Sequence, residues 1–100
     1  MRRVFVLNDG GHDYSAAEKF GKITFCSSNL INRWDIAQMY REMKEALYEA
    51  NFDDYIMISS LTSLCCVATA IMADRFGVVN FLVWKDSQYI ERSLVLDNTE

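Results

Sequence analysis

The chain has 100 residues and a formal net charge of −4 at pH 7; 51% of its residues are apolar and 24% are charged. This composition is ordinary for a globular domain and excludes a disordered chain, a collagen and a membrane bundle. A chain of this length forms one hydrophobic core, so we expect a single domain over residues 1–100. The acidic balance also argues against general binding of DNA or RNA.

The cysteines and the first residues indicate the compartment. Cys26, Cys65 and Cys66 are an odd number without a CxxC spacing, which is a poor basis for disulfide bonds. We therefore expect free thiols in a reducing setting. The apolar run Val4–Leu7 is too short for a signal peptide, and no run approaches the roughly 18 apolar residues of a membrane span. The sequence thus predicts a cytoplasmic protein that does not bind membranes.

The predicted elements alternate between strands and helices along the chain. Short apolar runs bounded by turn residues predict strands at Val4–Leu7, Lys22–Cys26, Tyr55–Ile58, Val78–Trp84 and Tyr89–Leu94. Helical spacing and capping signals predict helices at Ser15–Phe20, Asp35–Ala50 and Ser63–Phe76.

The two longer helices differ in how their apolar residues are distributed. In Asp35–Ala50 these residues recur every three or four positions and form one stripe, consisting of Ile36, Met39, Met43, Leu47 and Ala50. In the other helix, Leu64–Ala73 is apolar nearly all round, so it needs a sheet on one side and a further partner on the other. We predict that a second subunit covers that other side, which makes the protein a homo-oligomer.

Strands that alternate with helices predict an α/β fold with parallel pairing and right-handed crossovers. We expect a small Rossmann-like three-layer sandwich with a mostly parallel five-stranded sheet. Its strand order is 2-1-3-4-5, and its C-terminal edge strand is antiparallel. We expect the 63–76 helix on one face, with room there for the 15–20 helix, and the 35–50 helix on the other face.

Three polar loops follow the carboxyl ends of the expected strands. In open α/β sheets, ligands bind beyond these ends, at the point where the winding reverses. That point lies here between the first and third strands. The candidate ligand-binding residues in the three loops are Asn8, Asp9, Gly10, Gly11, His12, Asp13, Tyr14 and Ser15, then Ser27, then Ser59, Ser60, Thr62 and Ser63.

The chemistry of these loops suits a small phosphorylated ligand. The pair Gly10-Gly11 lets the backbone approach a ligand closely, and the hydroxyl-rich start of the 63–76 helix favours an anion. Asp9 or Asp13 can accept hydrogen bonds from ribose, and Tyr14 can stack on a base. We therefore predict a nucleotide-like ligand and no cofactor. Neither GxGxxG nor GxxxxGK[ST] is present, and the alternative is that the glycines only form a turn and the serines only cap a helix.

His12 is the single histidine of the chain and is flanked by Asp9 and Asp13. A metal site would need further ligands, but there is no second histidine and no cysteine at ligand spacing. A nucleophilic site would need Ser59 or Ser60 to reach His12, with an orienting carboxylate crowded into the same loop. We therefore predict no metal ligand and no catalytic residue, and expect a solvated loop histidine.

The run Asn8–Ser15, the pair Phe20-Gly21, the run Asp53–Ile56 and the run Asn80–Leu82, with Tyr89 and Arg92, resemble small α/β proteins carried by bacteriophages. The resemblance covers most of the chain. It implies no activity and no catalytic residue. It suggests a phage accessory protein that antagonises host defences, either by binding a host protein or by sequestering a nucleotide signal.

Three functional hypotheses follow. The first is a non-enzymatic module that binds a nucleotide-like ligand at the loop edge. The second is a protein-interaction module that inhibits a host protein through its acidic surface or its edge strand. The third is a small hydrolase that uses His12.

Overall fold

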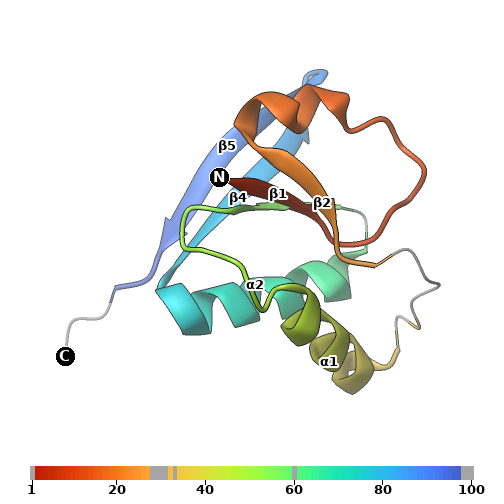
Figure 1. The fold of residues 1–100 in the computed structure, drawn as a ribbon, viewed down its shortest axis with the longest axis vertical. Coiled ribbons are helices and arrows are strands. Elements are labelled where there is room, and N and C mark those ends of the chain that lie inside the picture. The colour runs from red at the N-terminus through yellow and green to blue at the C-terminus, as the bar shows by residue number, and fades with distance from the viewer. Residues whose placement is uncertain (1, 28–31, 33, 60, 98–100) are drawn as a thin grey trace.

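The computed structural model describes residues 2–27, 32, 34–59 and 61–97. In chain order, the elements are β1 (Arg3–Val6), the 3-10 helix η1 (Ser15–Phe20), β2 (Lys22–Phe25), α1 (Ile36–Ala46), β3 (Tyr55–Met57), α2 (Thr62–Phe76), β4 (Val78–Lys85) and β5 (Gln88–Val95). The strands form one sheet in the order β2-β1-β3-β4-β5, parallel except for the antiparallel pair β4–β5 (Figure 1). The predicted fold class, strand order and antiparallel edge strand are confirmed.

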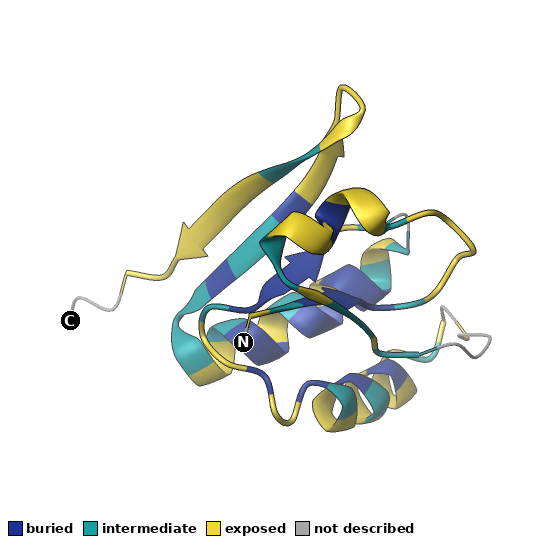
Figure 2. Ribbon diagram, turned by 45° about the horizontal axis from the view of Figure 1, so that its top comes forward, coloured by how far each residue is buried: buried dark blue, intermediate teal, exposed yellow. Residues whose placement is uncertain are grey.

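The sheet is covered on both faces, so the fold has three layers. One face carries α1 and α2, and the other carries η1 (Figure 1). On the face of the two α-helices, Phe5 and Ile56 of the sheet pack into the main core. On the opposite face, Val4 and Tyr55 pack with Ala17 of η1 in a smaller core. Figure 2 shows the buried residues concentrated in the sheet and on the inner faces of the helices.

The predicted distribution of the helices over the two faces is wrong, because α1 lies beside α2 and not opposite it. The handedness of the crossovers explains the arrangement. The connection from β1 to β2 runs toward one edge of the sheet, whereas those from β2 to β3 and from β3 to β4 run the other way. Crossovers of one hand then place η1 on one face and both α-helices on the other.

The position of α1 also answers why α2 is apolar nearly all round. Leu64, Ala68 and Met72 of α2 share one core with Met39 and Met43 of α1. The side of α2 for which we predicted a second subunit is therefore occupied by a helix of the same chain. The structure gives no reason for a subunit contact through Leu64–Ala73, and homo-oligomerisation through that helix stays a prediction.

Helix α1 begins where predicted and ends earlier. The Asp35 side chain caps its start by accepting a hydrogen bond from the Gln38 N–H at 3.0 Å. The helix ends at Ala46 and not at Ala50, because the Arg75 guanidinium of α2 binds the carbonyls of Leu47 and Tyr48. Leu47 is nevertheless fully buried. The apolar stripe predicted the buried residues better than it predicted the helix end.

The hairpin β4–β5 reaches beyond the rest of the sheet. Asp86 and Ser87 have φ angles of 53° and 63°, as in a two-residue type I′ turn, which matches the twist of paired strands. Strand β3 pairs with β4 only over Asn80–Leu82, so the turn end of the hairpin extends past β3 (Figure 1). This extension places the Trp84↔Tyr89 pair beside the carboxyl ends of β1 and β3.

A buried carboxylate joins β1 to the turn before β3. Asp54 has no exposed surface, and its two carboxylate oxygens accept hydrogen bonds from the N–H groups of Arg3 and Asn51, each at 2.8 Å. The Arg3 Nε lies 3.9 Å from Asp54 Oδ2. These contacts set the relative position of β1 and β3 and hence of the loops that follow both strands.

The three cysteines are free thiols: Cys26 is half-buried, Cys65 is buried and Cys66 is exposed. Among the described residues, no helix combines the length and the apolar character that a bilayer-crossing helix needs.

Gly21 lies where η1 meets β2, and replacing it with alanine should destabilise the fold. A Cβ atom at this position would lie 2.7 Å from the carbonyl oxygen of Arg2, a backbone atom that also accepts a hydrogen bond from the Lys22 N–H. The first pair of the β1–β2 ladder must shift to admit the methyl group. We expect Gly21→Ala to lower the free energy of unfolding by about 2 kcal/mol, measured by chemical denaturation. An unchanged midpoint would contradict the close approach of the two strands.

The Cys26 thiol and the Tyr55 hydroxyl, both with raised pKa values, predict a loss of stability at high pH. Burial raises the pKa of the Cys26 thiol to about 12. Burial, together with the hydrogen bond from its hydroxyl to the Glu91 carboxylate, raises the pKa of Tyr55 to about 12. Above about pH 9 both groups ionise in the unfolded chain while they stay neutral in the folded chain. Their contribution to the free energy of unfolding is therefore fully present below about pH 9 and is lost as the pH rises toward 12.

The measurement is the free energy of unfolding between about pH 8 and pH 12, from denaturant titrations. We expect a decline in the wild type and a shallower decline in Tyr55→Phe and in Cys26→Ala. Equal slopes in all three chains would contradict the assignment of the decline to these two groups.

Candidate functional site

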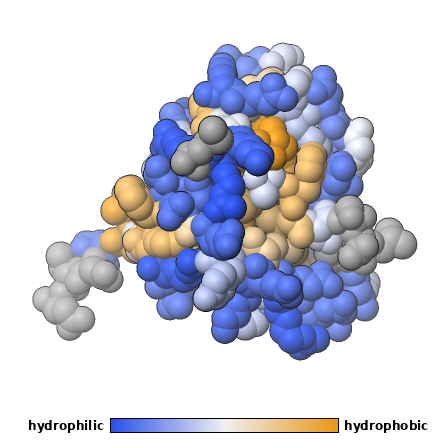
Figure 3. Space-filling model, in the orientation of Figure 1, coloured by the Kyte–Doolittle hydropathy of each residue, from blue (hydrophilic) through white to orange (hydrophobic). Residues whose placement is uncertain are grey.

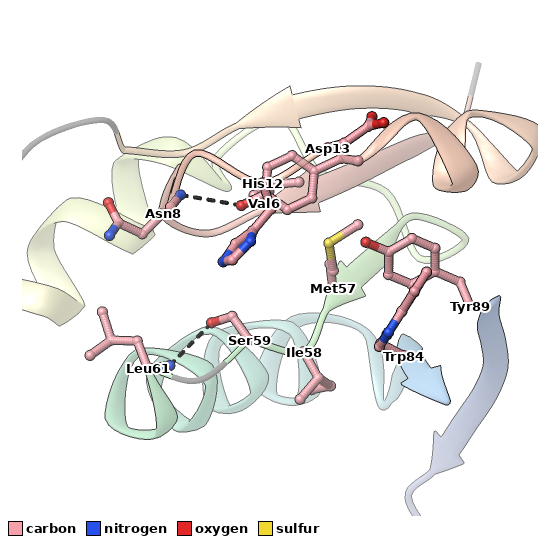
Figure 4. A pocket seen from close by; sticks show the side chains of 12 residues that line it. Val6, Asn8, His12, Asp13, Met57, Ile58, Ser59, Leu61, Trp84 and Tyr89 are labelled. Carbon is pink, nitrogen blue, oxygen red and sulfur yellow. Dashed lines mark hydrogen bonds between the residues drawn. The ribbon is translucent and has the colours of Figure 1, made fainter. Parts of the chain in front are cut away.

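A cavity of about 550 Å³ lies at the carboxyl ends of β1 and β3, where the winding of the sheet reverses (Figure 4). Its size is typical of small-molecule sites. The residues that line it come from the last residues of β1 and β3, the loops that follow them and the β4–β5 hairpin; they are Val6, Asn8, Gly10, His12, Asp13, Tyr14, Met57, Ile58, Ser59, Leu61, Trp84 and Tyr89. The two loops that we predicted to be neighbours do share one cavity.

The loop after β1 is shaped by its own polar side chains. Asp9 Oδ1 accepts a hydrogen bond from the Gly11 N–H, and Asp13 Oδ1 accepts one from the Ser15 N–H, both at 2.9 Å. These are local turns in which a carboxylate replaces a backbone carbonyl. Gly11 has a φ of +79°, which favours glycine. Asp9, Gly11 and Ser15 thus form the loop and do not line the cavity.

Gly10 lies in the wall of the cavity. A Cβ atom there would lie 3.3 Å from the His12 ring, and the Gly10 N–H donates a hydrogen bond to the Tyr14 hydroxyl at 3.2 Å. Gly11 does not line the cavity and serves the turn. A role of Gly10 in ligand binding stays a prediction.

The His12 ring points into the cavity (Figure 4) and meets the Tyr14 ring edge-on, with 6.2 Å between the ring centroids. The Asp13 carboxylate points away from the cavity, and its hydrogen bond from the Ser15 N–H lowers the pKa of Asp13. Within the described part of the chain, neither Asp9 nor Asp13 is hydrogen-bonded to His12. The orienting carboxylate that the hydrolase hypothesis needs is not in place.

Only part of the predicted hydroxyl cluster reaches the cavity. Ser59 lines it, its N–H donates to Cys65 Sγ at 3.4 Å, and its hydroxyl accepts a hydrogen bond from the Leu61 N–H at 3.4 Å. Thr62 and Ser63 lie in the first turn of α2 and do not line the cavity. Ser60 lies outside the described residues. Helix α2 starts after Leu61, and no side chain of the described residues caps its first N–H groups.

Ser27 helps to hold the loop after β1 in place. Its carbonyl accepts a hydrogen bond from the Asp9 N–H at 3.1 Å, which ties the loop after β1 to the end of β2. Ser27 is not among the residues that line the cavity. In this structure Ser27 helps to position the loop after β1, and a contact with a ligand stays a prediction.

The aromatic wall of the cavity was missed in the sequence. Trp84 and Tyr89 face each other across the hairpin with 4.7 Å between their ring centroids, and both line the cavity (Figure 4). The sequence contains a signal for this wall. Trp84 and Tyr89 flank the predicted turn, and the predicted sheet places their hairpin next to the Tyr55–Ile58 strand. The apolar pattern assigns both residues to strands and gives them no role at the loop edge.

The rest of the wall is mainly apolar, and among the described residues it carries no lysine and no arginine. Val6, Met57, Ile58 and Leu61 form its floor and side. Polar side chains also line the cavity; they are Asn8, His12, Asp13, Tyr14, Ser59 and Tyr89. The described residues contain no group of three or more His, Cys, Asp or Glu side chains that could hold a metal ion. The site is suited to holding a flat, partly apolar molecule.

The family model of the phage Pam3 gp32-like protein matches residues 2–96 of the chain. No curated protein and no solved structure matches the chain. The family match includes both loops of the cavity and the hairpin that forms its aromatic wall. The chain therefore belongs to the phage Pam3 gp32-like protein family, which confirms the resemblance to small α/β proteins carried by phages.

Proposed function

We propose that this protein is a non-enzymatic binding module that holds a small nucleotide-like ligand in the cavity between the loops after β1 and β3. The observation that carries the proposal is the combination of an apolar, aromatic-walled cavity with a few convergent polar groups at the switch point of the sheet. Trp84 and Tyr89 offer ring surfaces on which a base can stack.

The polar groups of the cavity fit the other parts of such a ligand. Asn8 and Ser59 can exchange hydrogen bonds with ribose hydroxyls. Helix α2 begins directly after Leu61, which lines the cavity; its N-terminus has no side-chain cap among the described residues, and such an end favours negative charge. The Asp13 carboxylate, which would repel a phosphate, points away from the cavity. A nucleotide with few phosphates fits this set better than a polyphosphate, because the described wall has no lysine and no arginine.

In this proposal the protein acts in the cytoplasm of the infected host and sequesters a nucleotide signal of host defence. The phage family and the three free thiols are the observations that support this setting. The absence of an assembled nucleophile, base and orienting carboxylate among the described residues favours binding over hydrolysis.

The test is a thermal-shift panel on the intact chain. The probes are the four common mononucleotides, their nucleosides, a cyclic mononucleotide, a cyclic dinucleotide, ADP-ribose and inorganic phosphate alone. A ligand at 100 times its Kd stabilises the folded chain by about 2.7 kcal/mol, which raises the Tm by several degrees. A shift with a nucleotide and none with phosphate supports the proposal. No shift with any probe overturns it.

A second candidate is a protein-interaction module that inhibits a host protein. The observation in its favour is a set of exposed aromatic side chains along and beside α1: Trp34 before the helix, Tyr40 within it and Tyr48 after it. Large aromatic residues are enriched in protein interfaces. A Trp34→Ala, Tyr48→Ala double variant should then lose partner binding while keeping any nucleotide-dependent thermal shift.

A further inference from the structure

We infer that a second copy of this chain pairs with β5 along its open edge, in antiparallel orientation, so that the two sheets join into one continuous sheet. The inference does not depend on the ligand proposed above. It rests on the backbone groups that β5 leaves open, on its exposed apolar residues, and on a pairing register that covers these residues without placing like charges opposite each other.

The backbone of β5 presents free hydrogen-bonding groups to one side. In β4, the Leu82 carbonyl accepts a hydrogen bond from the Ile58 N–H and so points toward β3. Backbone direction alternates along a strand, so odd-numbered residues of β4 point toward β5. Their partners are the even-numbered residues of β5, such as Phe81 with Arg92. The N–H and C=O groups of Glu91, Ser93 and Val95 therefore point toward the open edge.

Apart from Glu91 and Arg92, this edge has few of the features that normally protect one. Every residue from Glu91 to Asp97 is exposed (Figure 2), although three successive residues, Leu94, Val95 and Leu96, are large and apolar with 45%, 72% and 41% of their surface exposed. Apolar atoms gather at the surface beside this end of β5, next to the grey C-terminal residues in Figure 3. The strand has no proline, no lysine and no break in its register with β4. A long, unbroken edge of this kind is a template for another strand.

The charges of β5 select the register. In a symmetric antiparallel pair, the two-fold axis places one residue opposite its own copy. An axis at Glu91 or at Arg92 places like charges directly opposite each other, which is destabilising. Axes at Ile90 and at Ser93 both avoid this, but only the axis at Ser93 pairs the exposed Leu94 and Val95 with the second copy. It places Leu94 opposite Arg92 and Val95 opposite Glu91 of the second copy. In this register the open groups of Glu91, Ser93 and Val95 form the hydrogen-bonded pairs, and exposed Leu94 packs on the aliphatic part of Arg92.

The occupant is a second copy because β5 of another chain has the same length as this edge, can run antiparallel to it and places no like charges opposite each other. The Glu91 carboxylate is already bound by the Tyr55 hydroxyl of its own chain. Arg92, whose side chain donates to the Glu91 carbonyl, is the remaining charge at the centre of the strand. A substitution at Leu94 therefore tests the register directly, because it faces Arg92 of the second copy.

The experiment compares Leu94→Lys with Leu94→Glu by sedimentation velocity, from about 1 µM to about 200 µM protein. Both substitutions place a charge at the same exposed position of the monomer, so each controls for the other. The wild type should form dimers as concentration rises. Leu94→Lys places a cation opposite Arg92 and should raise the dimer Kd about tenfold relative to Leu94→Glu. A weaker effect of lysine than of glutamate, equal effects, or a wild type that stays monomeric overturns the inference.

Val95 offers a second pair if either Leu94 variant fails to fold. It faces Glu91 of the second copy in the proposed register, so the expected order is reversed. Val95→Glu should weaken the dimer and Val95→Lys should not. A dimer that none of the four substitutions changes would be formed through another surface and would equally overturn the inference.

Discussion

Replacing Asp54 with alanine is expected to lower the free energy of unfolding by about 3 kcal/mol. The carboxylate is fully buried and accepts hydrogen bonds from the backbone N–H groups of Arg3 and Asn51. Alanine would leave both part-buried donors without this acceptor, and loss of a buried acceptor from such donors costs about 1–3 kcal/mol in all. It would also remove the carboxylate beside the Arg3 guanidinium. Urea denaturation of the variant measures the loss directly.

The chain contains a matched control at the preceding position. Asp53 is also a carboxylate and lies 3.9 Å from the Arg2 guanidinium, but it is exposed. Exposed ion pairs contribute little, so Asp53→Ala should change stability by less than about 1 kcal/mol. Asp54→Asn retains one acceptor oxygen and should fall between the two alanine variants. Equal losses for Asp53→Ala and Asp54→Ala would show that Asp54 does not join β1 to the turn before β3.

The second large effect is expected at Trp84. If a base stacks on the aromatic wall, Trp84→Ala removes one of its two rings and should weaken nucleotide binding between about tenfold and a hundredfold. Loss of the Trp84 ring from the turn end of the hairpin should cost little stability, because that end is exposed and reaches beyond β3. Isothermal titration with the nucleotide that gives the largest thermal shift measures the change in Kd.

Trp34→Ala is the control for this substitution. Trp34 is 86% exposed and does not line the cavity, so its removal changes the tryptophan content of the chain without touching the site. Its Kd should equal that of the wild type. A Trp84→Ala chain that binds the nucleotide as tightly as the wild type would place the ligand elsewhere on the molecule.

The sequence predicted the sheet because each strand is a short apolar run between clear turn residues. It did not predict the layers correctly, although the information was present. The strand order and the single hand of crossovers together require the 35–50 and 63–76 helices to share a face, and we had not combined the two rules. The end of α1 depends on Arg75, which lies far along the chain and leaves no local signal near Ala46.

In the cavity too, features set by neighbouring residues in the sequence were predicted better than features that depend on residues far along the chain. The loop Asn8–Tyr14 was predicted from its own residues, and most of it lines the cavity. The hydroxyl cluster was expected to act as a unit, but a helical start turns successive side chains in different directions, and of its described members only Ser59 lines the cavity. Trp84 and Tyr89 reach the site because the hairpin extends past β3, which depends on strand lengths that apolar runs do not define closely.

Trp84 also provides the most direct test of the proposed site. In a Trp34→Phe chain, Trp84 is the sole tryptophan, so its fluorescence reports on the cavity wall alone. Titration of the nucleotide panel into this chain should give a saturable change in Trp84 emission with at least one nucleotide, at one ligand per chain, and none with inorganic phosphate. Emission that stays constant up to about 1 mM of every nucleotide would contradict the account, because a ligand bound at that concentration must contact the wall that Trp84 forms.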